Sequence, residues 1–254
     1  MAASWLRRAD VVRPDASDPQ VRPGCSTAEN DPLPFALLAL TAVTGLVDAV
    51  SFLGLGHVFT ANMTGNVVLL AFAVAGTPGL SVARSSTSLV AFLVGAALGG
   101  RLGVAMASAR RRSWLLTVAL SEALLLVTAA IASIGFDIGS ATPPGRLYTV
   151  IVLTALAMGL RNATVRRLAV PDLTTTVLTL TLTGVAADSS VAGGDNSRIG
   201  RRVASVALMF AGAAVGTLLL RRGLALPLVV SAVGVLAATV AYADVPTPPP
   251  AVAP

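Results

Sequence analysis

Residues 45–66, GLVDAVSFLGLGHVFTANMTGN, carry the polar side chains best suited to chemistry in a chain otherwise dominated by Ala, Val, Leu and Gly. Asp48 could bind a proton or a cation in a central cavity, and a charged residue at membrane depth costs roughly 2.5–3.5 kcal/mol. Asn62, Thr64 and Asn66 offer amide and hydroxyl groups. Two interpretations stay open: these groups bind a substrate or ion, or they fix packing and satisfy an interrupted helix.

The second half of the chain holds a related polar set. GLRNATVRRLAVPDLTTTV at 159–177 aligns without a gap on residues 45–63, 114 positions earlier, so that Asn162 falls on Asp48. Thr174, Thr175 and Thr176 fall beside the NMTGN side of the first copy, and their hydroxyls could also bond to carbonyls of their own helix. We expect the two polar segments to face each other near the middle of a membrane.

Three further residues are candidates for a role. His57 is the sole histidine and could sense pH or relay a proton, although an interfacial histidine without a role is the favoured interpretation. Arg101 and Glu122 lie at equal distances from a turn at Arg110–Arg112, which predicts an ion pair across a hairpin. That pair could simply offset the cost of burying each charge.

The composition predicts a polytopic helical membrane protein. Hydrophobic residues make up 55% of the 254 residues and charged residues 12%, whereas soluble domains are about a quarter charged. All 18 basic residues are arginine and alternate with apolar runs, which indicates a positive-inside bias rather than nucleic-acid binding. With one cysteine, Cys25, and one histidine, the chain predicts no internal disulfide, no metal site and no cofactor.

Eight apolar segments long enough to mark as helices recur along the chain. They are roughly 34–54, 57–76, 86–108, 114–135, 147–163, 172–188, 203–220 and 224–242. If all eight crossed a bilayer, nine arginines would lie inside and eight outside. If the second and sixth segments instead enter and leave on one side, thirteen lie inside and four outside; Arg101, within a span, is left out of both counts. We therefore expect six full spans plus two re-entrant or broken segments, with the N-terminus in the cytoplasm.

The same pattern predicts an internal duplication within one transmembrane domain, residues 32–244. GAALG at 95–99 resembles GAAVG at 212–216, so the repeats are 34–135 and 147–242. Three spans per repeat is an odd number, which makes the two repeats inverted relative to each other, as in many secondary transporters. Residues 1–31 are expected to be a disordered basic tail and 245–254 a Pro-rich tail.

The run G-x-V-D-A-V-S-F-L-x-L-G-x-V-F-x-A-N-M-T-G-N resembles the signature of the YoaK-like family of bacterial multi-pass membrane proteins, a domain of unknown function. The G-L-R-N-A and T-T-T stretches of the second half are similar to that family too, although Gln often replaces Arg161 there. The resemblance covers about 34–242 and implies the bacterial cytoplasmic (inner) membrane. It implies no substrate and no activity.

Three functions remain open. The first is a small-solute transporter or permease whose central site is formed by broken helices. The second is a non-transporting membrane subunit or regulator. The third, an intramembrane enzyme, is disfavoured because no Ser or Cys has a usable base, leaving only an Asp48–Asp188 pair. The expected partners are the lipid bilayer, an unknown small solute and further copies of the chain, with no nucleic acid.

Overall fold

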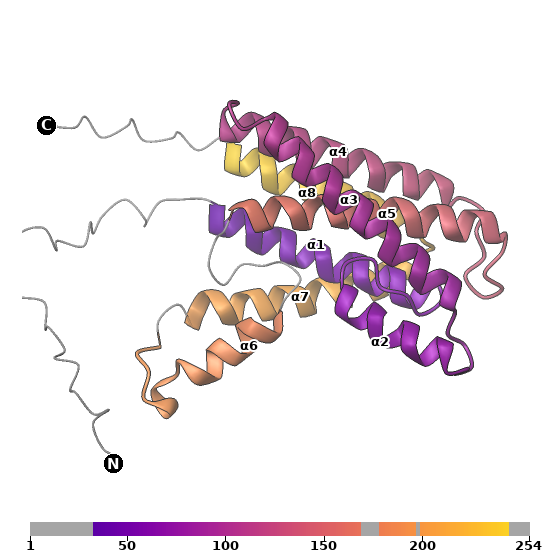
Figure 1. The fold of residues 1–254 in the computed structure, drawn as a ribbon, viewed down its shortest axis with the longest axis horizontal. Helices are drawn as coiled ribbons and strands as arrows, with labels where there is room; N and C mark the ends of the chain where they lie inside the picture. The colour runs from indigo at the N-terminus through magenta and orange to yellow at the C-terminus, as the bar shows by residue number, and fades with distance from the viewer. Residues whose placement is uncertain (1–32, 169–177, 197–198, 244–254) are drawn as a thin grey trace, which may run out of the picture. The chain divides into compact units, whose positions relative to one another are not determined.

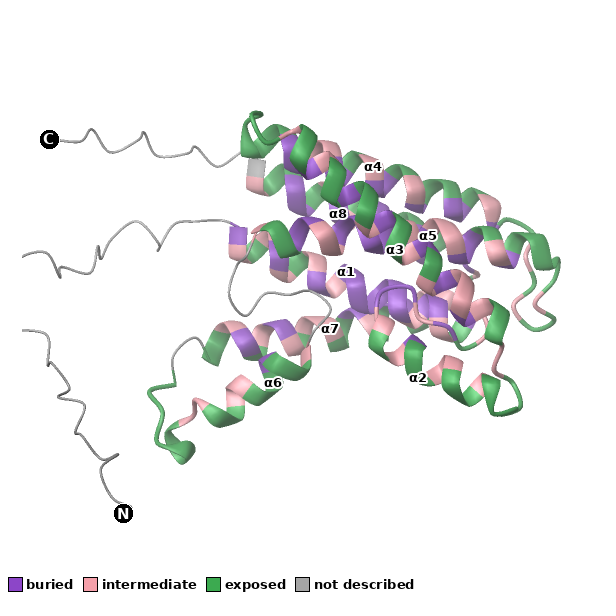
Figure 2. Cartoon of the chain, in the orientation of Figure 1, coloured by how far each residue is buried: buried purple, intermediate pink, exposed green. Residues whose placement is uncertain are grey.

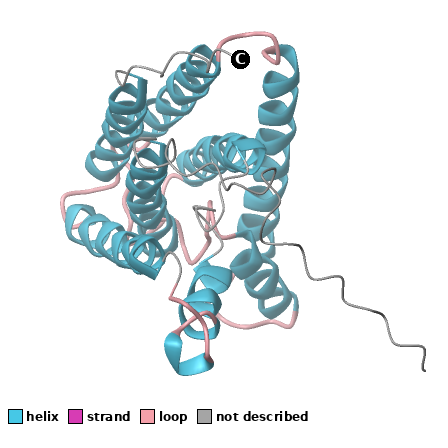
Figure 3. Ribbon diagram, turned by 90° about the vertical axis from the view of Figure 1, so that its left-hand side faces the viewer, coloured by secondary structure: helices cyan, strands magenta, loops and turns pink. Residues whose placement is uncertain are grey.

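The fold is a bundle of α-helices. A computed structural model describes residues 33–168, 178–196 and 199–243, and these residues form helices and loops with no β-strand (Figure 3). The predicted tails and Thr174, Thr175 and Thr176 lie outside the described residues. The described helices are α1 (Leu33–Gly54), α2 (Met63–Val74), α3 (Val82–Ala105), α4 (Arg111–Ala132), α5 (Pro144–Leu168), α6 (Leu178–Ala187), α7 (Ile199–Leu220) and α8 (Ala225–Ala243), with a 3₁₀ turn at Ser190–Ala192.

Six of these helices are long and apolar enough to cross a bilayer, namely α1, α3, α4, α5, α7 and α8. The helix α2 has 12 residues and α6 has 10, so each is about 15–18 Å long at 1.5 Å per residue. A bilayer core is about 30 Å thick, and neither short helix can span it. The prediction of six spans and two shorter apolar segments is confirmed.

Four helices form the inner bundle and two lie outside it. The inner helices α1, α4, α5 and α8 contact one another, whereas α3 packs on α5 and α7 packs on α1. The short helices lie further out, α2 on α3 and α6 on α7. Burial follows this order: 39–61% of each inner span is buried, against 28% for α3 and 17% for α7 (Figure 2). Most exposed side chains of α3 and α7 are apolar, as a lipid-facing surface requires, with Arg101 and Thr217 as exceptions.

Glycines allow the outer helices to approach the inner ones closely. A Cβ on Gly45 of α1 would overlap the Met209 carbonyl oxygen of α7, and one on Gly212 of α7 would overlap the Ala42 carbonyl oxygen. Such contacts between small residues give helices in lipid much of their packing energy.

The pairing of α5 with α3 uses the same device. A Cβ on Gly159 of α5 would overlap the Phe92 carbonyl oxygen of α3, and one on Gly95 would overlap the Leu156 carbonyl oxygen. No larger residue fits at these positions without separating the helices.

The long helices run between two ends of the bundle, which we call the proximal end (left in Figure 1) and the distal end (right in Figure 1). The proximal end holds the start of α1, the α3–α4 turn and the ends of α5 and α8. The distal end holds the end of α1, the α4–α5 loop and the α7–α8 turn.

Local sequence sets several helix starts: the Ser81 hydroxyl accepts a hydrogen bond from the Arg84 N–H and begins α3. Pro144 occupies the first position of α5, where no N–H is needed.

An apolar core fills the inner bundle toward the distal end. We define the distal cluster as the fully or almost fully buried Val47, Val50, Leu126, Ala129, Leu147, Val150, Ile151 and Leu228. These side chains come from all four inner helices. Apolar side chains therefore fill the inner bundle toward this end.

Candidate functional site

The polar run 45–66 forms a turn and a short helix that are bonded back onto α1. After α1 ends, the chain reverses through Gly56 and His57, whose φ angles are +82° and +60°. The Asp48 carboxylate then accepts hydrogen bonds from the backbone N–H groups of Ala61 (3.0 Å) and Asn62 (3.4 Å). Asp48 thus satisfies the non-helical backbone that precedes α2.

The two asparagines of NMTGN serve the same backbone. The Asn62 side chain caps α2 by accepting from the Gly65 N–H at 3.2 Å. The fully buried Asn66 accepts from the Phe59 N–H at 2.9 Å and donates to the Phe59 carbonyl at 2.5 Å and the Ser88 hydroxyl at 3.1 Å. These groups have protein partners, so the geometry favours the interpretation in which the motif satisfies an interrupted helix.

The other predicted site residues are dispersed. The side chain of Thr64 is exposed on α2. His57 is exposed in the turn, with its ring edge-on to Phe52 at a centroid distance of 5.2 Å. The Asn162 amide donates to the Met158 carbonyl of its own helix at 2.8 Å.

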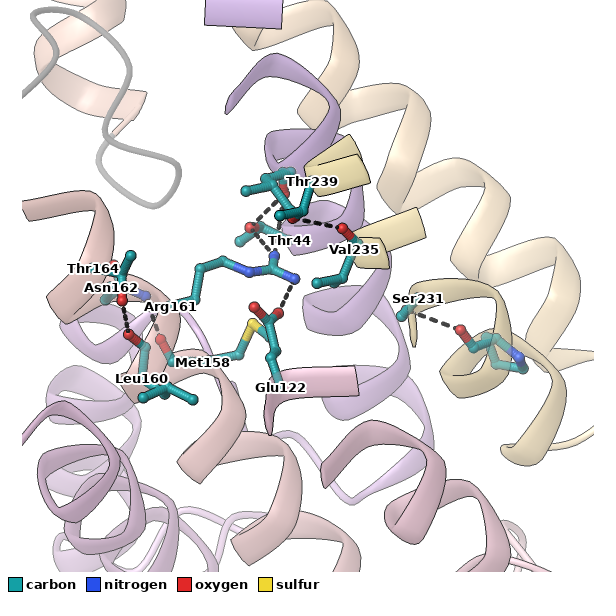
Figure 4. Close-up of polar contacts among 12 residues, drawn as sticks. Thr44, Glu122, Met158, Leu160, Arg161, Asn162, Thr164, Ser231, Val235 and Thr239 are labelled. Atoms are coloured by element: carbon teal, nitrogen blue, oxygen red, sulfur yellow. Dashed lines mark hydrogen bonds and ion pairs between the residues drawn. The ribbon is translucent and has the colours of Figure 1, made fainter. Parts of the chain in front are cut away.

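The buried ion pair joins Glu122 to Arg161, and the prediction that Arg101 is the partner of Glu122 is wrong. The guanidinium Nη2 of Arg161, on α5, donates to the Glu122 carboxylate, on α4 (Figure 4). Arg101 is exposed on α3. The predicted hairpin fails because α3 packs mainly on α5, whereas α4 packs on α5 and α8.

Arg161 is the largest fully buried side chain of the described core, with 1% of its surface exposed, and Glu122 has 2%. The Nη1 of Arg161 donates to the Thr44 hydroxyl at 2.9 Å and to the Leu40 carbonyl at 3.2 Å. Its Nε is buried with no hydrogen-bond partner among the described residues. Breaking such a pair by removing one partner costs about 3–5 kcal/mol, because an uncompensated charge stays buried.

A pocket in the proximal half of the bundle is lined in part by this ion pair. It lies between the four inner helices and has a cavity volume of about 40 Å³. Its lining runs from Leu33, Leu168 and Tyr242, near the proximal ends of α1, α5 and α8, to Arg161 and Glu122 further along the bundle. Glu122 is the twelfth of the 22 residues of α4, so the pair lies about halfway through the span. Apart from the ion pair, Thr164, Thr239 and Tyr242, the lining side chains are apolar.

Arg161 is one of the thirteen arginines placed inside by the positive-inside count, which gave no indication of its burial. The signal was present, since Arg161 falls inside the apolar segment 147–163, where only a paired charge is tolerated. Among the residues that the structure describes, no group of three or more His, Cys, Asp or Glu side chains could hold a metal ion.

Comparisons with known proteins place the chain in a family. The family model described as "Protein of unknown function (DUF1275)" matches residues 36–241. The chain is 35% identical over 158 residues to the UPF0700 transmembrane protein YoaK of Bacillus subtilis (strain 168). That alignment covers 61% of this chain and 65% of the relative, and no solved structure matches. With six candidate spans and a relative described as transmembrane, this is a membrane protein, and it belongs to the DUF1275 family of proteins of unknown function.

Proposed function

We propose that the protein is a small-solute transporter that works by alternating access, with its binding site at the Arg161–Glu122 pair. One observation carries the proposal: a pocket in the proximal half of the inner bundle is lined by a buried charge pair, while buried apolar side chains fill the distal half. A carrier caught open to one side has this arrangement, and its site lies near the middle of the membrane.

An inverted duplication is part of the proposal, and the helix contacts support it. In the first repeat the close glycine of α1 is Gly45, and 114 residues later Gly159 plays the same part in α5. Each meets an outer helix of the other repeat, at Met209 and Phe92, which are 117 residues apart. The offsets match those found in the sequence. Because α1 and α5 run in opposite directions in the bundle, the two repeats would be related by a two-fold axis in the membrane plane (Figure 1).

The two repeats supply equivalent residues to the open and closed ends. Leu33, Ala36 and Leu37 of α1 line the pocket. The residues 114 positions later, Leu147, Val150 and Ile151, belong to the distal cluster. The proximal residues Leu33 and Leu37 also belong to a small buried cluster with Val165, but only the proximal set lines the pocket. A second state would exchange the pocket between these equivalent surfaces.

The arginines support an orientation with the proximal end in the cytoplasm. Of the described arginines near helix ends, seven lie at the proximal end: 110, 111, 112, 166, 167, 201 and 202. Four lie at the distal end: 84, 146, 221 and 222. This excess favours a cytoplasmic N-terminus in the bacterial inner membrane and a pocket open to the cytoplasm.

Cysteine labelling tests alternating access without knowledge of the substrate. In a Cys25→Ser background, Thr239→Cys places a thiol in the pocket wall and Ser231→Cys places one behind it on the same helix, about 12 Å deeper. Both native hydroxyls only donate to carbonyls of α8, at 2.9 Å, so both variants should fold. A charged, membrane-impermeant thiol reagent is applied to inside-out and right-side-out vesicles.

We expect Thr239→Cys to react from the cytoplasmic side and Ser231→Cys to react, more slowly, from the opposite side. Reaction of both thiols from one side only, under every ion gradient tried, would refute alternating access. The protein would then be a static membrane component such as a subunit or regulator.

A further inference from the structure

The charges of the pocket indicate what it carries. We propose that the pocket binds a small monocarboxylate with an apolar body, and that one proton is taken up by Glu122 for each carboxylate bound. This inference rests on the proposed function, since it names the solute and the coupling ion of the same site.

Arg161 is built to receive an anion. Its guanidinium is held at the end of the pocket by two neutral acceptors, the Leu40 carbonyl and the Thr44 hydroxyl. Neither acceptor neutralises the charge. Glu122 is the carboxylate paired with it, and Asp48 interacts with it electrostatically without a hydrogen bond between them. The buried Nε has no partner among the described residues, so an incoming carboxylate can take both Nε and Nη2 in the paired geometry that guanidinium groups favour.

Charge balance supplies the coupling. In the empty pocket, Arg161 and the Glu122 carboxylate sum to zero. If a carboxylate replaced Glu122 on Arg161 while Glu122 stayed ionised, the buried site would carry a net negative charge, at a cost of several kcal/mol. If Glu122 takes a proton from water as the anion arrives, the sum is again zero. Because the site is neutral with and without the solute, the empty and the loaded protein can each change state without a buried net charge.

No other titratable group of the pocket competes for this role. The packed elements present Arg161 from α5 and Tyr242 from α8, and α1 presents only Thr44 and its backbone. Asp48, also on α1, is engaged with the amides that precede α2. One cation admits one carboxylate, and a second negative charge on the solute would meet an apolar wall.

The dimensions suit a small solute. A cavity of about 40 Å³ holds roughly three water molecules at 10–15 Å³ each, about the room that a carboxylate group needs. The rest of the solute would lie toward the mouth, against the leucine and valine side chains of α1, α4 and α5.

Binding of benzoate to the purified protein in nanodiscs tests the inference. Benzoate is ionised between pH 6 and 8, so any proton taken up on binding goes to the protein. We expect benzoate to raise the midpoint of thermal unfolding and to withdraw one proton per molecule bound from a weakly buffered solution containing a pH dye. The affinity of the protein for benzoate should fall about ten-fold for each unit by which the pH rises. Benzamide and benzylamine, which match its shape without its charge, should do neither.

The variants assign the groups. Glu122→Gln should bind benzoate without proton uptake and with less than two-fold change in affinity from pH 6 to 8. The double variant Arg161→Gln/Glu122→Gln keeps the site neutral, so it should fold, and it should not bind benzoate. Arg101→Gln, which removes an exposed arginine outside the pocket, should behave as the wild type.

Benzoate binding without proton uptake, or equal binding of benzamide, would overturn the inference. So would an absence of benzoate binding. If any of these three results is found while Ser231→Cys still reacts from the distal side, only the solute class and the proton coupling are refuted. Proton-linked benzoate binding with no reaction at that thiol would instead refute transport and leave the site standing.

Discussion

The Arg161–Glu122 pair makes a quantitative prediction about stability. In a double-mutant cycle with Arg161→Gln and Glu122→Gln, the double variant should lose less free energy of unfolding than the sum of the losses of the two single variants. The two side chains contact each other at 1–2% exposure, so neither charge can turn to water when its partner is lost.

The magnitude follows from that burial. Removing one member of a buried pair costs about 3–5 kcal/mol, and we expect each single variant to lose this much free energy of unfolding. The double variant removes both charges and should recover most of one such loss. The coupling energy should therefore be about 3 kcal/mol, whereas independent sites more than about 7–10 Å apart add within about 0.5 kcal/mol.

Reversible unfolding of the protein in mixed micelles, titrated with denaturing detergent, gives the four free energies of the cycle. The matched control is the cycle of Glu122→Gln with Arg101→Gln, the pair that hairpin geometry predicts, which should be additive. Additivity in the Arg161 cycle, or a comparable coupling energy in the Arg101 cycle, would show that the charges are not paired as the structure has them.

Three further predictions concern the scaffold. Asn66→Ala should lower the free energy of unfolding by about 2–3 kcal/mol, because it leaves buried backbone groups unpaired, whereas the exposed Thr64→Ala should change it by less than about 0.5 kcal/mol; thermal unfolding checks both. Gly159→Ala should destabilise by about 1–3 kcal/mol through overlap with the backbone of α3, and Gly100→Ala, where a Cβ meets nothing within 4 Å, should not; the same assay applies. The Asp137 carboxylate accepts hydrogen bonds from the Ser140 hydroxyl and from two backbone N–H groups of the same loop. These bonds lower the pKa of Asp137 below its ordinary value of 3.8. The order of that exposed loop should be complete above pH 3.8 and lost as the pH falls through the lowered pKa, which amide exchange from pH 2 to 6 in the wild type and in Asp137→Asn can follow.

Hydrophobic runs were sufficient to predict the helices but not their exact limits. The thickness of the bilayer fixes how long an apolar run must be, so six long and two short segments could be counted from the sequence. The polar ends were harder: α3 begins at Val82, four residues before its apolar run, because Ser81 caps it. Likewise α5 continues to Leu168, past the predicted end at 163, because Arg161 is buried rather than placed in a loop.

The sequence did not show which helices are neighbours. The turn at Arg110–Arg112 suggested a hairpin of α3 and α4, yet α3 pairs with α5. The glycines at 95, 99 and 103 recur every four residues, and all three face α5. Small residues at a spacing of four allow close approach to any helix that also presents backbone there. They do not specify which helix approaches.

The polar run at 45–66 was conspicuous because its side chains are unusual for a membrane span. A helix that stops within the bilayer also requires polar side chains, with no ligand involved. Every freed N–H and carbonyl there needs a partner at a fixed place, which demands particular residues such as Asp48 and Asn66. Those residues leave little capacity for a solute. A binding group must instead keep a donor that the protein has not matched, and Arg161 meets that condition through its Nε. Unmatched hydrogen-bonding capacity, which appears only once the contacts are known, is therefore the basis of the site proposed for this protein, rather than local richness in polar residues.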